Sequence, residues 1–275
     1  MSEAEVIKRS KVAVTRSLLI RDLQKIGLAE GMTVIVHSSM SRIGWLCGGP
    51  VTLISALQSV LTPSGTLVMP AHSADVSDPA DWENPSVPSS WFHDIYQEMP
   101  AFDPRRTPTF GMGRVAETFR SFPDVRRSNH PIYSFSAWGA DRDALISRHP
   151  LDDGLGKDSP LGKIYDRAGY VLLIGVGYGN NTSMHLGEYL SGKLEMVERS
   201  SPVRMKGRRQ WVTYQDGDYH EENFEAIGKA FEASQPGSAV FRFRRIGQAP
   251  SILLAQRAIV DFTARYIKEK FDESK

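Results

Sequence analysis

One strand–helix–strand pattern limits what this chain can fold into more than any other feature. Residues 33–37 (Thr-Val-Ile-Val-His) form a short, almost continuous apolar run, which is typical of a strand buried inside an α/β sheet. Residues 51–61 carry apolar side chains at helical spacing, and residues 66–69 begin a second apolar run. Such a unit joins neighbouring parallel strands through a right-handed crossover. The pattern therefore predicts an α/β protein.

The rest of the chain continues this alternation. Residues 170–177 are the most apolar run and are expected to form a central strand, while 203–214 resemble a hairpin around Lys206-Gly207. Further strands are expected at 134–139 and 240–246, and helices at 113–122, 159–167, 182–189, 221–234 and 251–271. Because no repeat and no Gly/Ser-rich linker divides the chain, we expect one domain over residues 1–275.

Composition excludes several classes of protein. Lys and Arg (33) almost balance Asp and Glu (32), whereas a general nucleic-acid binder carries a marked basic excess. A single cysteine, Cys47, excludes an intrachain disulfide and a cysteine-cluster zinc site. The first residues lack a signal-peptide pattern, and no stretch approaches the roughly 18 apolar residues of a membrane span. We expect a cytoplasmic protein that binds neither membranes nor nucleic acid.

A long, poorly patterned excursion covers residues 71–110. Between residues 71 and 104 it holds seven carboxylates and five aromatic side chains but no Lys or Arg, so it would attract a cation. We expect Asp75, Trp82 and Glu83 to contact such a ligand. A solvated acidic surface loop is the alternative interpretation.

A serine-rich turn follows the first predicted strand. His37-Ser38-Ser39-Met40-Ser41 leads to Gly48-Gly49-Pro50 at the start of a helix, an arrangement that offers backbone N–H groups to an anion. The segment matches neither the Walker A motif nor GxGxxG. It could equally be an ordinary connection with capping residues.

Two short spacings are candidates for acid–base chemistry. His185-x-x-Glu188 lies in a predicted helix, where residues three apart share a face, and His149-x-x-Asp152 lies in a predicted loop. A histidine beside a carboxylate suits a general base with an orienting group. A core-edge histidine satisfied by Glu188 is the structural alternative. The seven histidines show no ligand-spaced cluster, so we expect no metal.

These features, in this order, resemble the aminoglycoside N-acetyltransferases of the antibiotic acetyltransferase family, and most of all its YokD-like bacterial members. The resemblance covers roughly residues 15–265. It rests on seven short sequence motifs, here called landmarks: each is weak evidence alone, but all seven in the same order along the chain are specific. The landmarks are His37-Ser38-Ser39 with Gly44-Trp45 and Gly48-Gly49, Gly65-Thr66-Leu67-Val68-Met69-Pro70, Thr107-Pro108 with Gly111-Met112-Gly113, Arg127-Ser128-Asn129-His130-Pro131, His149-Pro150-Leu151-Asp152 with Gly154-Leu155-Gly156, Ser159-Pro160-Leu161-Gly162-Lys163, and His185-Leu186-Gly187-Glu188.

The resemblance implies a three-layer α/β/α fold with a central mixed, largely parallel sheet. It implies direct acetyl transfer from acetyl-CoA to an amine, classically the 3-amino group of a 2-deoxystreptamine aminoglycoside, and hence antibiotic resistance. His185 would be the general base, and Glu188 and Asp152 would orient it or hold the acceptor. The residues that would line the acetyl-CoA channel are His37, Ser38, Ser39, Met40, Ser41, Thr107, Phe110, Gly111, Met112 and Gly113. The thioester oxyanion would be bound by the serine-rich turn or by Thr107.

Several alternatives stay open at this point. A member of this family could acetylate an amine that is not an antibiotic, and a metal-dependent hydrolase or an idle CoA-binding protein would belong to other classes. A homodimer through the strand at 240–246 is also compatible with the sequence. Gly187 stands where the commoner form of this motif, His-Leu-Ala-Glu, has alanine. Glycine in place of alanine weakens a helix by up to ~1 kcal/mol.

Overall fold

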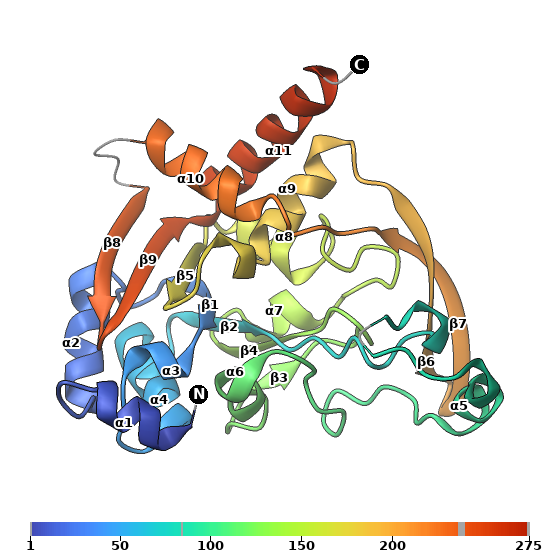
Figure 1. The fold of residues 1–275 in the computed structure, drawn as a ribbon, viewed down its shortest axis with the longest axis horizontal. Helices are drawn as coiled ribbons and strands as arrows, with labels where there is room; N and C mark the ends of the chain where they lie inside the picture. The colour runs from blue at the N-terminus through green and yellow to red at the C-terminus, as the bar shows by residue number, and fades with distance from the viewer. Residues whose placement is uncertain (1, 84, 236–239, 274–275) are drawn as a thin grey trace.

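The computed structural model describes residues 2–83, 85–235 and 240–273, and a mixed sheet of seven strands lies at the centre of these residues (Figure 1). The order across the sheet is β3-β4-β2-β1-β5-β9-β8. These strands are β1 (Thr33–Ser38), β2 (Thr66–Pro70), β3 (Arg126–Arg127), β4 (Phe135–Gly139), β5 (Tyr170–Ile174), β8 (Phe241–Ile246) and β9 (Ala249–Ala255).

Only the middle of this sheet is parallel. Strand β1 pairs in parallel with β2 and β5, which is why all three read as near-continuous apolar runs. The pairs β2–β4, β3–β4, β5–β9 and β8–β9 are antiparallel. The sheet is mixed as expected, but the expectation that it is largely parallel holds only for the three central strands. The carboxyl ends of β1, β2 and β5 meet at one edge.

Helices cover both faces of the sheet, which confirms three α/β/α layers. Alternate β1 side chains point to opposite cores: Val34 and Val36 belong to one and Ile35 to the other. On the first face lie α2 (Arg16–Ile26), α4 (Gly49–Leu61) and α6 (Gly113–Arg120); on the second lie α7 (Arg142–Ile146), α8 (Pro160–Asp166), α9 (Ser183–Ser191), α10 (Phe224–Ser234) and α11 (Gln256–Glu273). The shorter helices are α1 (Glu3–Arg9), α3 (Met40–Ile43), α5 (Phe92–Glu98), η1 (Pro79–Asp81), η2 (Ser89–Trp91) and η3 (Tyr178–Asn180).

A hairpin outside the main sheet supports the acidic excursion. Strands β6 (Met196–Met205) and β7 (Arg208–Gly217) pair antiparallel through Lys206-Gly207, both with positive φ, so the predicted hairpin is confirmed. The indole Nε1 of Trp211 donates to the carbonyl of Tyr96 in α5 at 2.7 Å. Figure 1 shows this hairpin beside α5, at the opposite end of the molecule from β8. The excursion is therefore held by the hairpin.

One predicted helix begins later than expected. Residues 251–255 belong to β9, and α11 begins only at Gln256. The strand forms because these apolar residues pair with β5 on one side and β8 on the other. No helix in the described part of the chain is long and apolar enough to span a membrane.

Gly187 is explained by the packing of α9 on α11. A β-carbon at this position would lie 2.6 Å from Cβ of Thr263 and 2.9 Å from the carbonyl oxygen of Val260. We expect Gly187→Ala to lower the free energy of unfolding by about 1–3 kcal/mol, because overpacking outweighs the better helix propensity. Urea unfolding measures this, with Gly179→Ala as a control because its β-carbon would meet open space. A more stable Gly187→Ala variant would show that the two helices simply move apart.

Candidate functional site

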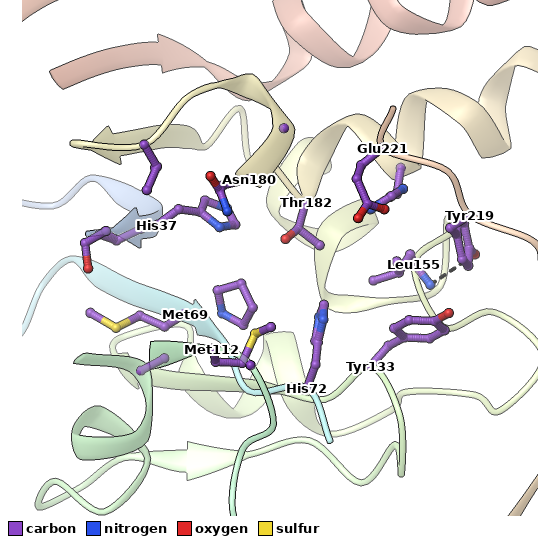
Figure 2. Close-up of a pocket in the computed structure, with 18 residues that line it drawn as sticks. His37, Met69, His72, Met112, Tyr133, Leu155, Asn180, Thr182, Tyr219 and Glu221 are labelled. Atoms are coloured by element: carbon purple, nitrogen blue, oxygen red, sulfur yellow. Dashed lines mark hydrogen bonds between the residues drawn. The ribbon is translucent and has the colours of Figure 1, made fainter. Parts of the chain in front are cut away.

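The carboxyl ends of the central strands open into a cavity of about 310 Å³ (Figure 2). Strand β1 contributes His37 and Ser38, and His72 follows β2. In Figure 2, His37 and Asn180 lie at one end of this pocket, and Tyr133 and Tyr219 lie at the other. We call this the His185 pocket; its lining also includes Met69, Pro70, Gly111, Met112, Leu155, Val176, Thr182 and Glu221. It lies where open α/β sheets place their ligands.

His185 and Glu188 meet on the inner face of α9, as their spacing predicts. Nδ1 of His185 lies 2.6 Å from Oε2 of Glu188, whose Oε1 accepts from the backbone N–H of His220 at 3.3 Å. Because a carboxylate only accepts hydrogen bonds, Nδ1 carries the imidazole proton and Nε2 keeps its lone pair. No described residue makes a hydrogen bond to Nε2. The pair has the geometry of a general base with its orienting carboxylate.

Two further histidines line the same pocket. Burial, and to a smaller extent repulsion from His185 when that ring is protonated, lowers the pKa of His37 and of His72 to about 3. Both rings are therefore neutral at ordinary pH, and the Nε2 atom of each is buried with no hydrogen-bond partner among the described residues. Of the three histidines in the pocket, His185 is the one whose imidazole is held by a carboxylate.

The serine-rich turn borders a second cavity of about 520 Å³, here called the serine groove. It shares Ser38, Gly111, Met112, Val176 and Asn180 with the His185 pocket, so the two adjoin. Arg42 and Arg114 also line it and could pair with phosphate groups. The predicted channel residues Ser39, Met40 and Gly113 lie here too, and Ser41 lies in an adjoining cavity at the N-terminus of α4.

Two predicted channel residues lie elsewhere. The hydroxyl of Thr107 accepts the backbone N–H of Asp103 at 3.0 Å, and its carbonyl accepts from Arg127. Thr107 therefore stabilises the local turn, and it lines neither the His185 pocket nor the serine groove. Phe110 is 52% exposed and lines the cavity formed by the acidic excursion instead.

The acidic excursion forms a third cavity of about 430 Å³, here called the acidic pocket. The predicted residues Asp75, Trp82 and Glu83 all line it. Tyr133 borders both this pocket and the His185 pocket, so the two adjoin. Arg199 from β6 also lines the acidic pocket; its Nη2 lies 3.0 Å from Oδ1 of Asp218.

The second histidine–carboxylate spacing does not form a pair. His149 is buried, with Nδ1 at 2.9 Å from the Ser128 hydroxyl and Nε2 at 2.8 Å from the carbonyl oxygen of Gly154. Burial lowers its pKa well below the usual value. Asp152 is exposed and lines none of the three cavities. His185 is oriented by Glu188, and no contact supports the predicted part for Asp152.

Sequence reasoning missed several residues of the site. Tyr133, Thr182 and Tyr219 line the His185 pocket, and Arg199 lines the acidic pocket. Thr182 directly precedes α9, the helix that carries His185. This position is the one sequence signal that could have placed a residue of this group in the site. Across residues 2–83, 85–235 and 240–273, no group of three or more His, Cys, Asp or Glu side chains is arranged to hold a metal ion.

Comparison with known proteins agrees with this geometry. The family model described as aminoglycoside 3-N-acetyltransferase matches residues 35–268. The chain is 42% identical to the aminoglycoside N(3')-acetyltransferase-like protein YokD of Bacillus subtilis over 95% of each chain. The crystal structure of YokD superimposes with a TM-score of 0.95 at 40% identity, covering 98% of this chain and 99% of YokD.

Two solved structures with bound ligands are also similar. AAC-IIIb in a binary complex with CoASH has a TM-score of 0.80 at 30% identity, covering 94% of this chain and 98% of that one. AAC-VIa bound to sisomicin has a TM-score of 0.81 at 28% identity, covering 94% and 99%. The family match over most of the chain, the mixed sheet and the paired His185 and Glu188 agree with one another, and we conclude that this chain belongs to the aminoglycoside 3-N-acetyltransferase family.

Proposed function

We propose that this protein transfers the acetyl group of acetyl-CoA directly to an amine of an aminoglycoside, the 3-amino group of 2-deoxystreptamine, with His185 as general base. One observation supports this most strongly. His185, paired with Glu188, lines a pocket that adjoins the serine groove on one side and the acidic pocket on the other. A donor with phosphates and a cationic acceptor can therefore approach the base from opposite sides.

His185 is needed to remove a proton from the acceptor amine. An aminoglycoside amine is protonated near neutral pH, and it must lose a proton before its lone pair can attack the thioester carbon. Nε2 of His185 accepts the proton, and Glu188 stabilises the imidazolium that forms. The C–S bond then breaks, the CoA thiolate takes one proton, and one proton per turnover passes to solvent. No covalent bond to the enzyme is required.

The oxyanion needs hydrogen-bond donors on the side of the serine groove. Ser38 borders both cavities, and Figure 2 shows Thr182 in the wall of the His185 pocket. No described residue makes a hydrogen bond to the Thr182 hydroxyl, so it is available as a donor. These hydroxyls replace Thr107, which lines neither the His185 pocket nor the serine groove.

Acetyl-CoA binding tests the donor side of the proposal. AAC-IIIb, a relative with the same fold, was solved with CoASH. We expect CoA to bind this protein and to raise its melting temperature, with Arg42 and Arg114 pairing with its phosphates. Titration calorimetry measures this, and Arg42→Gln with Arg114→Gln should weaken binding. An absence of heat at millimolar CoA would contradict the proposed function.

Charge neutralisation tests the acceptor side. AAC-VIa was solved with sisomicin, a cationic aminoglycoside. We expect Asp75→Asn with Glu83→Gln to raise the acceptor KM severalfold and to flatten its dependence on ionic strength, because steering of a charged ligand is screened by salt. The acetyl-CoA KM should stay unchanged.

Asp94→Asn with Glu98→Gln is the matched control for this test. Both residues lie in the same acidic excursion, on α5, but neither lines the acidic pocket. The control should leave the acceptor KM near that of the unmodified protein. Equal effects of the two double variants would show that the excursion acts only through its total charge.

A further inference from the structure

The base is held by aromatic rings as well as by Glu188. The ring of Tyr219 meets the imidazole of His185 at a centroid distance of 5.3 Å and an interplanar angle of 68°. Phe224 meets the same imidazole at 4.7 Å and 54°. Tyr219 also packs edge-on against Tyr133 at 5.5 Å. It therefore contacts both the base and the residue that borders the His185 pocket and the acidic pocket.

The hydroxyl of Tyr219 is anchored below the pocket. It accepts the backbone N–H of Leu155 at 3.2 Å, a hydrogen bond visible in Figure 2, and it donates to Oδ1 of Asp216 at 3.4 Å. Burial raises the pKa of this hydroxyl above its ordinary value, so it stays protonated and can donate. The ring therefore has both a polar anchor and a packing face.

Asp216 is itself fixed by the backbone. It is 1% exposed, and its Oδ1 accepts from the N–H groups of Gly154 at 3.2 Å and Gly217 at 2.8 Å. A β-carbon at Gly154 would lie 2.5 Å from Oδ2 of Asp216 and 2.6 Å from Cδ2 of Tyr133. Gly154 thus allows this loop to approach the carboxylate closely, and the loop, Asp216 and the two half-buried tyrosines pack as one unit.

We propose that Tyr219 is a positioning residue: anchored by Asp216 and Leu155, it holds the His185 imidazole against Glu188 and forms, with Tyr133, the wall on the acceptor side of the base. This proposal rests on the proposed function for its kinetic consequence. The structural part of the proposal, that Tyr219 fixes the orientation of the His185 imidazole, does not depend on which acceptor is acetylated. A ring that only filled space would contribute stability without affecting the base.

Three variants separate these possibilities. Tyr219→Leu removes the ring that touches His185, and Tyr219→Phe removes only the two hydroxyl hydrogen bonds. Tyr214→Phe is the matched control, because Tyr214 lies in β7 shortly before Tyr219, is buried, and loses one hydroxyl contact, at 3.2 Å to Ser201. Tyr214 does not line the His185 pocket.

We expect kcat to fall roughly 10²-fold in Tyr219→Leu, because small misplacements of a catalytic group have effects of this size. Tyr219→Phe should lower kcat about 3–10-fold, the effect of a neutral hydrogen bond. The acetyl-CoA KM should remain unchanged in both, and Tyr214→Phe should retain full kcat. Equal kcat in all three variants, measured below their melting temperatures, would overturn the proposal.

A second measurement does not need an acceptor. The Nδ1 proton that His185 shares with Glu188 is expected as a downfield NMR signal that is missing in His185→Gln. Its exchange with water should be about tenfold faster in Tyr219→Leu and unchanged in Tyr214→Phe. Equal exchange rates in Tyr219→Leu and Tyr214→Phe would overturn the proposal that Tyr219 positions the imidazole. If no acceptor is acetylated while this signal behaves as expected, the proposed function fails and the fixed imidazole stands.

Discussion

Replacing His185 by alanine is expected to lower turnover by roughly 10²–10⁴, the usual contribution of a general base. The substitution removes Nε2, the atom that takes the proton from the amine, and leaves the strands and the serine groove in place. The melting temperature and the affinity for CoA should therefore change little. Thiol release from acetyl-CoA at saturating acceptor measures the loss.

The Glu188→Gln variant is the companion to this test. Because Glu188 acts through His185, Glu188→Gln should lower turnover when His185 is present. In the His185→Ala background the same change should add little, since the effects of residues that work as a unit are not additive. Additive effects would mean that Glu188 contacts the acceptor on its own. Unchanged turnover in His185→Ala would remove His185 from the mechanism.

The second large effect is expected at Arg127, which joins both ends of the acidic excursion. Its guanidinium lies at 2.5 Å from the carbonyls of Ala71 and Thr107, at 3.0 Å from the Ser73 hydroxyl and at 2.8 Å from the Ser134 hydroxyl. The side chain is 8% exposed, and burial lowers its pKa to about 10, so it is still charged at neutral pH.

We expect Arg127→Met to lower the free energy of unfolding by roughly 2–4 kcal/mol, because four hydrogen bonds are lost and buried carbonyl groups lose a charged donor. The acceptor KM should rise as well, since residues 71–107 carry the acidic pocket. Chemical unfolding measures the first effect and steady-state kinetics the second.

Arg126→Met is the control for Arg127. This neighbouring residue is exposed, and its Nη1 lies 3.3 Å from Oδ1 of Asp143 in a surface ion pair of little expected value. Its loss should cost at most about 1 kcal/mol. An Arg127→Met protein as stable as the unmodified one would show that the apolar replacement compensates for the buried charge.

The centre of the fold was predictable because its signals are local. The strands in the runs at 33–37, 66–69 and 170–177 are buried on both faces over most of their length, so most of their residues are apolar and the strands stand out. The hairpin turn at Lys206-Gly207 was equally visible, since such turns require residues that accept positive φ. These elements depend little on their neighbours.

The outer strands were less predictable because their partners define them. Residues 251–255 run into α11 without a Gly or Pro between them, so their apolar pattern matched a helix as well as a strand. Strand β3 has only two residues and exists through its pairing with β4. The antiparallel direction of β4 and β9 is likewise a property of the assembled sheet, so the sequence predicts a mixed sheet without showing where its parallel part ends.

The residues of the candidate site likewise fall into those that the sequence predicts and those that it does not. His185 and Glu188 were predictable because their distance is set by one helix turn. Asp152 and Thr107 were assigned from loops, where spacing does not determine direction, and neither side chain lines the His185 pocket. Asp216 lies at the end of β7 and Tyr219 follows that strand, and only tertiary packing brings Tyr219 to a helix some 30 residues earlier in the chain.

The most direct test of the account is a thiol-release assay with the purified protein, acetyl-CoA and sisomicin, run beside simple monoamines, with the position of the acetyl group determined by NMR. The account predicts acceptor-dependent CoA release with sisomicin, acetylation at the 3-amino group, and loss of both in His185→Ala. Release of CoA only with amines that carry no 2-deoxystreptamine ring would contradict the proposed acceptor. No release with any amine, from a protein that binds CoA, would contradict the proposed transferase activity itself.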